Sequence, residues 1–371
     1  MKASDILIPP SQKERKPAEF GFGAMRLPSG RTDVRQMIYM YMDGGFNYFD
    51  TAYVYDNSEE MLKKELVARH ARESFLLADK IPPWLTRDAE QNDKLLRESL
   101  SRCGVDYFDF YLVHSLDSKN LKRAEAANVF EWIFKQKKKG YCRHVGFSFH
   151  GDAEQLEYIF LTYPQMEFVQ LQLNYADVLR GTAGELHRLA LEYDKPVIVM
   201  SPIKGGTLSA LPPKAEAVFK SASPDATPSS FAMRYAASLA GVTCVLSGVS
   251  SLNQVHDNMK TFSPLETLTA EEYDLFEKVL VELSKTASIT CTGCKYCHDD
   301  CPKQIDIAVC FSLYNESKRA PDFAWNRQMV YHTLPKGRRA SDCNACGACL
   351  ERCPQHIDVP SGLKEVAETF K

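Results

Sequence analysis

Eight of the twelve cysteines lie in two short runs near the C-terminus, and thiolates at such spacing bind metal clusters. Each run reads C-x₂-C-x₂-C-x₃-C and is followed by proline. Three thiolates this close together can converge on the irons of one [4Fe–4S] cluster, while the fourth reaches a neighbouring cluster. The sequence therefore predicts one cluster on Cys291, Cys294, Cys297 and Cys353, and a second on Cys343, Cys346, Cys349 and Cys301.

Structural zinc is the alternative for these cysteines. Zinc sites usually join two C-x₂-C pairs from separate loops, whereas three close cysteines and a remote fourth suit iron–sulfur clusters better. Each run resembles the motif of the bacterial two-cluster ferredoxin module. About 40 residues separate the two runs, more than the smallest ferredoxins use, and we expect them to form additional helix. The other four cysteines are isolated and are expected to be small buried side chains: Cys103, Cys142, Cys244 and Cys310.

A second set of reactive side chains follows three apolar segments in the first third of the chain. Asp50, Lys80 and His114 each end such a segment, and Tyr55 lies in the loop after the first. An ammonium ~4 Å from a phenol stabilises the phenolate by about 4 kcal/mol at an effective dielectric of ~20, up to ~3 pKa units before desolvation. Lys80 can thus make Tyr55 a proton donor near neutral pH, with Asp50 holding the lysine and His114 orienting a substrate oxygen.

Eight strand-like segments alternate with amphipathic helical patterns between residues 18 and 262. Near-continuous apolar runs are typical of strands buried in a parallel sheet. The predicted strands are 20–25, 46–50, 75–80, 108–114, 143–148, 168–173, 196–200 and 243–247. The predicted helices are 33–42, 58–70, 88–102, 121–139, 152–162, 182–193, 228–240 and 251–260, with one more over 269–284.

This alternation predicts an α/β chain with a (β/α)₈ TIM barrel, followed by a small, mostly helical, ferredoxin-like domain. A doubly wound open sheet is the competing fold, but it would carry a G-x-G-x-x-G turn after an early strand, and the sequence has none. We expect a polar arm over residues 1–18, the barrel over 19–285 and the cluster domain over 286–371.

Composition limits the function classes. The chain has 371 residues, 44% hydrophobic and 25% charged, which is typical of globular proteins. Its net charge of −3 offers no basic excess for a nucleic-acid partner. The N-terminus lacks the apolar core of a secretion signal, and no apolar run approaches the roughly 20 residues that span a bilayer. We therefore expect a cytoplasmic protein without a membrane partner.

The chain resembles the aldo/keto reductase family over roughly residues 18–262. The matching blocks are Gly21–Arg26, Phe46–Tyr55 with Ser58 and Glu59, Lys80, and Tyr111–His114. The resemblance implies a catalytic tetrad of Asp50, Tyr55, Lys80 and His114, and a nicotinamide cofactor across the mouth of the barrel. It also implies cofactor contacts at Gly23, Met25, Ser148, Gln170, Met200, Ser201, Lys204, Gly205, Ser247, Ser250, Gln254 and Asn258. The C-terminal cysteines resemble those of the subgroup with a ferredoxin-type domain.

The choice between NAD and NADP stays open. Residues 246–258 contain no Lys or Arg where NADP-preferring members bind the 2′-phosphate, a group that normally pairs with a cation. The substrate pocket is only indicated, by Met25, Trp84 and the neighbourhood of Ile203; Trp84 could equally be a loop anchor.

These features predict an oxidoreductase that reduces a small carbonyl compound, or oxidises an alcohol, with NAD(P) and two [4Fe–4S] clusters. A ferredoxin or flavoprotein would be the electron partner. Hydride transfer moves two electrons while each cluster moves one, so a direct link would need a mediator that the sequence does not reveal. Two alternatives stay open: clusters that are only structural or redox-sensing, and a barrel that serves as a non-catalytic electron-transfer scaffold.

Overall fold

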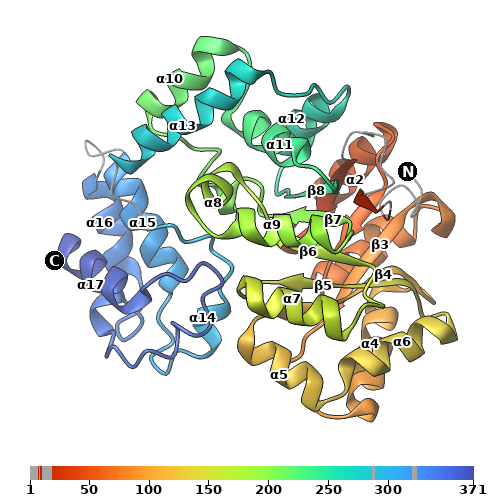
Figure 1. Cartoon of the computed structure of the whole chain (residues 1–371). Coiled ribbons are helices and arrows are strands. Elements are labelled where there is room, and N and C mark those ends of the chain that lie inside the picture. Colours follow the sequence, from red (N-terminus) through yellow and green to blue (C-terminus); the bar gives the residue numbers. More distant parts are fainter. Residues whose placement is uncertain (1–6, 8, 11–18, 286–288, 320–323) are drawn as a thin grey trace. The chain divides into compact units, whose positions relative to one another are not determined.

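The computed structural model describes residues 7, 9–10, 19–285, 289–319 and 324–371. The chain divides into two compact units. The first comprises Met1–Pro202 and Ser229–Thr269, and the second comprises Ile203–Pro228 and Ala270–Lys371. Figure 1 shows the strands and their helices in the red-to-green part of the chain and a helical part in blue.

A closed barrel of eight parallel strands forms the centre of the first unit, in the order β1 to β8 (Figure 1). All eight predicted strands are present and shifted by no more than two residues at either end. Their bounds are β1 Glu19–Gly23, β2 Tyr48–Asp50, β3 Leu76–Ile81, β4 Phe108–Leu116, β5 Cys142–Phe149, β6 Phe168–Gln172, β7 Val197–Met200 and β8 Val242–Gly248. The predicted barrel fold is thus confirmed.

Alternate residues of these strands point into the barrel, as the pleat of a strand requires. Their apolar side chains form one buried cluster, to which Leu7 of the N-terminal segment adds a partly buried contact. The cluster comprises Tyr48, Leu76, Ala78, Phe110, Leu112, Phe168, Ile198, Cys244 and Leu246. On β2, β3, β4 and β6 the next inward positions toward the carboxyl ends are polar (Asp50, Lys80, His114 and Gln170), and this layer contains the candidate site.

Helices surround the strands. In the first unit they are α2 Arg31–Asp43, α3 Ser58–Leu62, α4 Ala89–Cys103, α5 Ser118–Ala126, α6 Val129–Lys139, α7 Ala153–Thr162, α8 Tyr175–Arg180, α9 Ala183–Glu192, α11 Pro228–Ser238 and α12 Leu252–Phe262. Side-chain caps fix several starts: Asp88, Asp152 and Ser251 each accept a hydrogen bond from the backbone N–H three residues on.

Several helix predictions needed correction, among them the helix over 58–70, whose α-helical part ends at Leu62 and continues as a π-helical turn over Lys63–Val67. The single helix expected over 121–139 is two helices, α5 and α6, because Asn128 adopts a left-handed conformation (φ +50°) that ends the helical path. The short helix α8 was not predicted; Asn174 starts it by accepting a hydrogen bond from the N–H of Asp177. Such a brief segment is too short to show a helical period.

The second unit is helical. Its helices are α10 Pro213–Ala222, α13 Ala270–Ser284, α14 Tyr296–Asp299, α15 Ile307–Arg319, α16 Ala324–Thr333 and α17 Val359–Thr369. Helix α10, which was not predicted, packs against α13 through an edge-to-face pair of Phe219 and Phe276. Helices α15 and α16 are the extra helix expected between the two cysteine runs. Their core includes Cys297, Cys301 and Cys349 beside Phe311 and Leu363.

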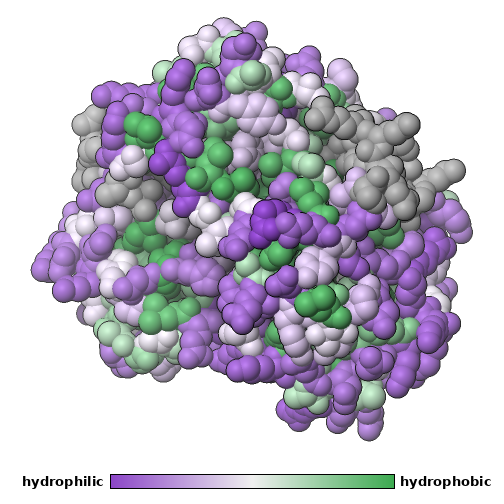
Figure 2. Space-filling view, in the orientation of Figure 1, coloured by the Kyte–Doolittle hydropathy of each residue, from purple (hydrophilic) through white to green (hydrophobic). Residues whose placement is uncertain are grey.

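The molecular surface is mostly hydrophilic, with scattered apolar groups on the face that Figure 2 shows. Within the described residues, every helix is too short or too polar to cross a bilayer.

Candidate active site and cluster-binding loops

Because alternate side chains of a strand point to the same side, Asp50, Lys80 and His114 come together at one end of the barrel. Asp50 follows the inward-facing Tyr48 by two residues, Lys80 follows Ala78, and His114 follows Leu112. All three are buried, with 4%, 0% and 2% of their surfaces exposed. They therefore form a polar layer above the apolar filling of the barrel, at the carboxyl ends where barrel enzymes build active sites.

Lys80 is held by two short hydrogen bonds. Its Nζ donates to Asp50 Oδ1 at 2.5 Å and to the carbonyl oxygen of Thr51 at 2.7 Å. The other carboxylate oxygen of Asp50 accepts from Gln170 Nε2 at 3.1 Å. An unpaired ammonium with no exposed surface would be very costly, so the Asp50 carboxylate compensates the lysine charge.

Tyr55 lies beside this ammonium. Lys80 Nζ is 4.9 Å from the centre of the Tyr55 ring. The loop that carries the tyrosine is closed by local bonds: the N–H of Tyr55 donates to Ala52 O, and the N–H of Ser58 donates to Tyr55 O at 2.7 Å. This compact turn keeps a half-buried tyrosine at the end of β2.

His114 completes the group from a third strand. Its ring lies edge-to-face with Tyr55, with ring centres 5.6 Å apart. Burial first, and the positive charge of Lys80 second, hold the pKa of His114 well below its usual value. His114 is therefore a neutral imidazole near pH 7, able to donate a hydrogen bond without carrying charge.

The backbone is strained directly after His114. Ser115 has φ +52°, and the register between β4 and β5 shifts between Val113 and Leu116. Ser148 Oγ stabilises this turn by accepting the N–H of Ser115 at 2.7 Å. Irregularities of this kind re-aim a side chain and are common beside functional sites.

Trp84 lies against His114, with ring centres 5.5 Å apart. Sequence reasoning left open whether this tryptophan was a loop anchor or a pocket residue. The contact places it at the tetrad, where it can form an apolar wall next to the imidazole.

The other candidate cofactor positions of the first unit lie at the ends of β1 and β5 to β8. Ser148 pairs with Gln170 across neighbouring strands, and Gln172 pairs with Met200. Gly23 pairs with Gly248, and any Cβ on Gly23 would lie 2.9 Å from the carbonyl oxygen of Ser247. Met25 and Ser201 follow the ends of β1 and β7, and both are half-buried.

The β8–α12 connection is tied together by side chains that were predicted at the adenosine end of the cofactor. Asn258 Nδ2 donates to Ser247 Oγ at 2.9 Å, and the N–H of Ser250 donates to Gln254 Oε1 at 2.7 Å. These bonds shape the loop at the N-terminus of α12, a position that favours an anionic group.

Lys204 and Gly205 belong to the second unit. Both have positive φ (+48° and +63°), and Lys204 is buried. A Cβ on Gly205 would lie 2.5 Å from the Cα of Thr292, so this position requires glycine for space as well as for conformation. The segment after β7 therefore packs closely on the first cysteine run.

The two cysteine runs fold alike. Residues two and four positions after the first cysteine of each run have positive φ: Gly293 (+68°) and Lys295 (+64°), and Ala345 (+52°) and Gly347 (+80°). In each run the N–H two residues after the first cysteine points to its sulfur at 3.4 Å. This tight turn directs three thiols to one side, as a cubane cluster requires.

The likeness continues beyond the cysteines, which sequence reasoning missed. Each run continues as C-P-x-x-I-D, with positive φ three residues after the last cysteine, at Gln304 and His356 (both +50°). Helix α15 begins directly after the first motif and α17 directly after the second. Aligning the two runs beyond their prolines would have revealed this duplication.

The electrostatic neighbours of two buried thiols come from both cysteine runs. Burial, then the thiols of Cys294, Cys353, Cys291 and Cys349, raises the pKa of Cys297 to about 12. Burial first, and then the thiols of Cys343, Cys301 and Cys346, raises the pKa of Cys349 to about 11. Each first-to-third set thus lies near the fourth cysteine of the other run. Bound iron would remove this repulsion, since a metal stabilises the thiolates.

The distances between possible metal ligands can be compared with those that a structural zinc site requires. Four thiolates on one zinc ion lie about 3.8 Å apart, given Zn–S bonds of about 2.3 Å. Over the described ranges of the chain, only Glu59, Asp79 and Cys103 bring three His, Cys, Asp or Glu donor atoms within 4.8 Å of one another. Among the described residues, no three of the clustered cysteines have their sulfurs all within that distance of one another.

That buried trio was not predicted. Burial first, and then the charge of Glu59, raises the pKa of Asp79 well above its usual value, so the Asp79 carboxyl holds a proton near pH 7. The second oxygen of Glu59 pairs with Arg102 at 3.2 Å. Asp79 points outward from β3, opposite to Lys80. In the sequence, only the alternation of side chains along β3 could have indicated this outward position.

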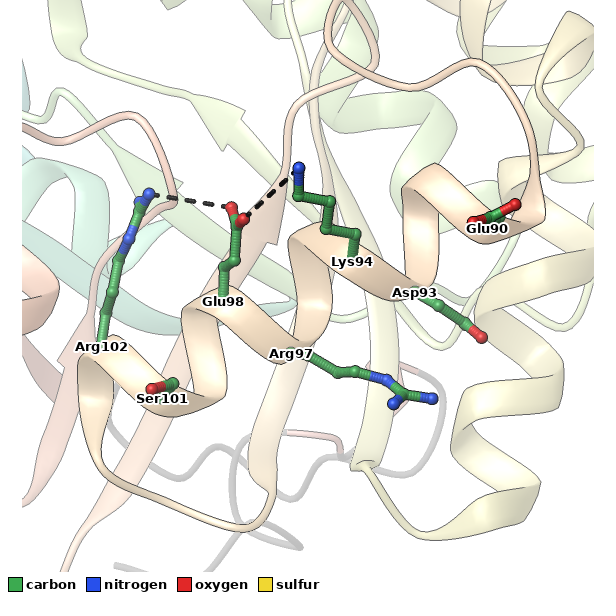
Figure 3. Close-up of a pocket in the computed structure, with 7 residues that line it drawn as sticks. All are labelled: Glu90, Asp93, Lys94, Arg97, Glu98, Ser101 and Arg102. Atoms are coloured by element: carbon green, nitrogen blue, oxygen red, sulfur yellow. Dashed lines mark ion pairs between the residues drawn. The ribbon is translucent and has the colours of Figure 1, made fainter.

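A surface hollow of about 710 Å³ lies along α4 (Figure 3). Its lining is polar and comes from this helix alone, with ion pairs from Glu98 to Lys94 and Arg102. None of the candidate site residues lines it, and it is distinct from the tetrad.

Comparison with known proteins agrees with this geometry. Residues 19–281 match the aldo/keto reductase family, and residues 290–357 match the 4Fe-4S dicluster domain. L-galactose dehydrogenase of Arabidopsis thaliana is 27% identical over 71% of this chain and 89% of its own length. Aldo-keto reductase AKR2E4 of Bombyx mori is 32% identical over 25% of this chain, which spans only 32% of that relative.

A solved aldo/keto reductase from Klebsiella pneumoniae, in complex with NADP and acetate, has the same fold. It superposes with a TM-score of 0.59 at 20% identity and covers 70% of this chain and 90% of its own. The family match spans most of the chain and agrees with the closed eight-stranded barrel. The chain is therefore an oxidoreductase that belongs to the aldo/keto reductase family, and it carries a C-terminal 4Fe-4S dicluster domain.

Proposed function

We propose that the chain reduces a small aldehyde or ketone with NAD(P)H, or oxidises the alcohol in reverse, with Tyr55 as the proton donor. Two [4Fe–4S] clusters would exchange electrons with a partner protein. The observation that supports carbonyl reduction in the barrel is the buried Lys80–Asp50 pair beside the Tyr55 ring.

When bound, the nicotinamide supplies or accepts the hydride. The chain's own residues then handle the proton and the position of the carbonyl. Lys80 is charged beside the phenol, so it favours the phenolate that remains once Tyr55 has donated its proton. Asp50 holds the lysine, and its second oxygen is occupied by Gln170.

His114 orients the carbonyl. Because its imidazole is neutral, it can donate one hydrogen bond to the substrate oxygen without competing with Tyr55 as an acid. Trp84 packs on the imidazole and would exclude water from the reacting carbon. This arrangement favours a small substrate with an apolar side next to the carbonyl.

Ser148 and Gln170 are the proposed partners of the nicotinamide carboxamide. Both are buried, on adjacent strands and in register with each other. Gln170 also donates to Asp50, so it would connect the bound cofactor to the Lys80–Asp50 pair.

The decisive test is Tyr55→Phe. We expect kcat for carbonyl reduction to fall about 10²–10⁴-fold, with cofactor affinity and the visible absorbance of the clusters unchanged. Tyr53→Phe is the matched control, because Tyr53 lies in the same loop but bonds to Glu98. Full activity of Tyr55→Phe would refute the mechanism. Titrations with NADH and NADPH, monitored by protein fluorescence, would settle the cofactor choice.

Purely structural clusters are the second candidate for the dicluster domain. Cys297, Cys301 and Cys349 belong to the core of their unit, which favours this role. We propose electron transfer because the chemistry of the barrel is redox chemistry. The separating measurement is turnover-linked reduction: adding a reduced substrate and cofactor anaerobically should bleach the clusters only if they exchange electrons.

A further inference from the structure

Tyr55 stays beside Lys80 only if its loop stays on β3, and backbone hydrogen bonds hold the first half of this loop. The N–H of Thr51 donates to Ala78 O at 2.9 Å, and the N–H of Tyr53 donates to Lys80 O at 3.4 Å. Both bonds lie before Tyr55 in the chain, so the second half of the loop depends on other contacts.

Side chains hold the second half of the loop. Ser58 Oγ lies 2.7 Å from Thr51 Oγ1, and both groups are buried. The next residue, Glu59, is 2% exposed and brings a carboxylate oxygen within 4.8 Å of a carboxylate oxygen of Asp79. Asp79 is fully buried and directly precedes Lys80 in β3. The Glu59–Asp79 contact thus joins the end of this loop to the strand that carries the lysine.

Each of these two carboxyl groups uses one oxygen elsewhere. Asp79 Oδ1 accepts the N–H of Lys80 at 2.7 Å, and Glu59 Oε2 pairs with Arg102 at 3.2 Å. In the part of the chain that the structure describes, the remaining oxygens, Asp79 Oδ2 and Glu59 Oε1, have no hydrogen-bond donor. Two buried acceptors satisfy one another only when one of them carries a proton. A protonated Asp79 supplies the missing donor to Glu59.

The surroundings keep this proton on Asp79. Burial first, and the charge of Glu59 second, raises the pKa of Asp79 well above its usual value, while Arg102 stabilises the charge of Glu59. The charge of Lys80 acts in the opposite direction on the pKa of Asp79 but is a smaller influence. The other titratable groups that face the pair stay neutral because burial raises their pKa values; they are Cys103 and Tyr111.

From these contacts we infer that Asp79 is a positioning residue for carbonyl reduction. By donating to Glu59, it fastens the end of the Tyr55 loop to β3 and so keeps the phenol beside the ammonium of Lys80. The inference rests on the proposed function, in which Tyr55 is the proton donor. The Asp79 side chain points away from the barrel interior, so its effect on the reaction passes through Tyr55.

The test compares two substitutions at Asp79. Asp79→Asn keeps an N–H donor for Glu59, and we expect its kcat to stay within about twofold of the wild-type value. Asp79→Val fills a similar volume without a donor, and we expect its kcat to fall about 10- to 100-fold because a reacting group is displaced. The assay is reduction of p-nitrobenzaldehyde, a small aldehyde with an apolar ring, by the full-length, cluster-loaded protein with whichever of NADH and NADPH binds more tightly.

Cofactor titrations separate positioning from general damage. For Asp79→Val, the Kd and the stoichiometry of nicotinamide binding, followed by protein fluorescence, should stay unchanged, whereas a partly unfolded sample would bind less cofactor. Asp109→Asn is the matched control. Asp109 is equally buried and pairs with Arg72 and Arg143, but it lies near the start of β4, at the opposite end from the tetrad. This variant should lose stability and keep its kcat.

A milder variant keeps the inference testable if Asp79→Val does not fold. Asp79→Thr retains a hydroxyl but ends one bond short of the carboxyl oxygens, and its kcat should fall between those of Asp79→Asn and Asp79→Val. If Tyr55→Phe is as active as the wild type, the proposed function and this inference both fail. If Tyr55→Phe is inactive but folded Asp79→Val or Asp79→Thr keeps the wild-type kcat, or Asp109→Asn loses as much kcat, only the positioning role is overturned.

Discussion

The barrel mouth and the cysteine runs achieve their geometry in opposite ways. At the mouth, residues from distant parts of the sequence meet because the alternation of side chains along each strand places them in one layer. Lys80, Asp50 and Gln170 are already bonded to one another without any ligand. In the cysteine runs, residues close in sequence make the site, and their thiols stay protonated near pH 7 because neighbouring thiolates would repel one another.

The contrast shows where each site draws its stability. The barrel supports its catalytic group with its own core, so that site should survive the loss of any ligand. The C-terminal helices share their core with Cys297, Cys301 and Cys349, so that region should depend on what the cysteines hold.

Breaking the buried ion pair should have the largest effect. Lys80→Met removes the cation beside Tyr55 and leaves Asp50 buried without its partner. We expect kcat to fall at least about 10²-fold and stability to fall by about 3–5 kcal/mol. Urea unfolding and steady-state kinetics would measure both. The double variant with Asp50→Asn should recover stability but not activity; recovery of both would argue against a catalytic role for the pair.

Removing the metal that the cysteines bind should separate the stability of the C-terminal helices from that of the barrel. Anaerobic chelation should abolish hydrogen-exchange protection in α15 and α17, while the amides of β3 and β4 keep theirs. The expected loss in the C-terminal part is several kcal/mol, as in other small metal-dependent folds. Equal protection of α15 and α17 with and without metal would show that their apolar core suffices.

The proton held by the buried Asp79 carboxyl gives a smaller effect of unusual sign. Because the folded-state pKa of Asp79 is raised, folding takes up a proton, and stability falls as pH rises from about 4 toward the folded pKa. Asp79→Asn should therefore stabilise the protein at pH 8 by about 1 kcal/mol or more, and this gain should vanish near pH 4.

Asp109 supplies the control for that prediction. It is equally buried but pairs with Arg72 at 2.7 Å and Arg143 at 3.1 Å. Asp109→Asn makes the same chemical change and should destabilise at pH 8. If both variants shift the denaturation midpoint in one direction, Asp79 is not protonated in the folded protein at pH 8.

The smallest effect concerns His114. Its lowered pKa means that the unfolded chain takes up a proton near pH 6.5 and the folded chain does not, so stability declines as pH falls below that value. Between pH 6 and 8 its ring resonances in NMR spectra should not titrate. The exposed His256 is the internal control; a midpoint for His114 near 6.5 would contradict a buried, neutral imidazole.

Much of this architecture follows from the sequence because it rests on local patterns. The eight strands were predicted because each is a short apolar run between turn signals, and the cysteine runs because their spacing encodes a turn. Asn128 was missed because a left-handed residue interrupts the path without interrupting the apolar period. The Glu59–Asp79 pair was missed because it depends on which side of β3 meets α3.

The tetrad is an intermediate case. Asp50, Lys80 and His114 could be found at strand ends, since parallel strands share one carboxyl edge. The bond from Gln170 to Asp50 could not, because it depends on the register between β2, β3 and the far side of the barrel. Nor could spacing show that Gly205 lies against Thr292, which depends on tertiary packing.

The exposure of Asn344, Ala345 and Cys346 also has a disadvantage for a metal–sulfur centre. A loop that is open to solvent also admits dioxygen, and a metal–sulfur centre near the surface is the first to be oxidised in air. Aerobic handling should therefore damage the second run before the first, leaving a half-loaded protein. Such a form would keep its barrel fold while losing contact with the outside electron supply.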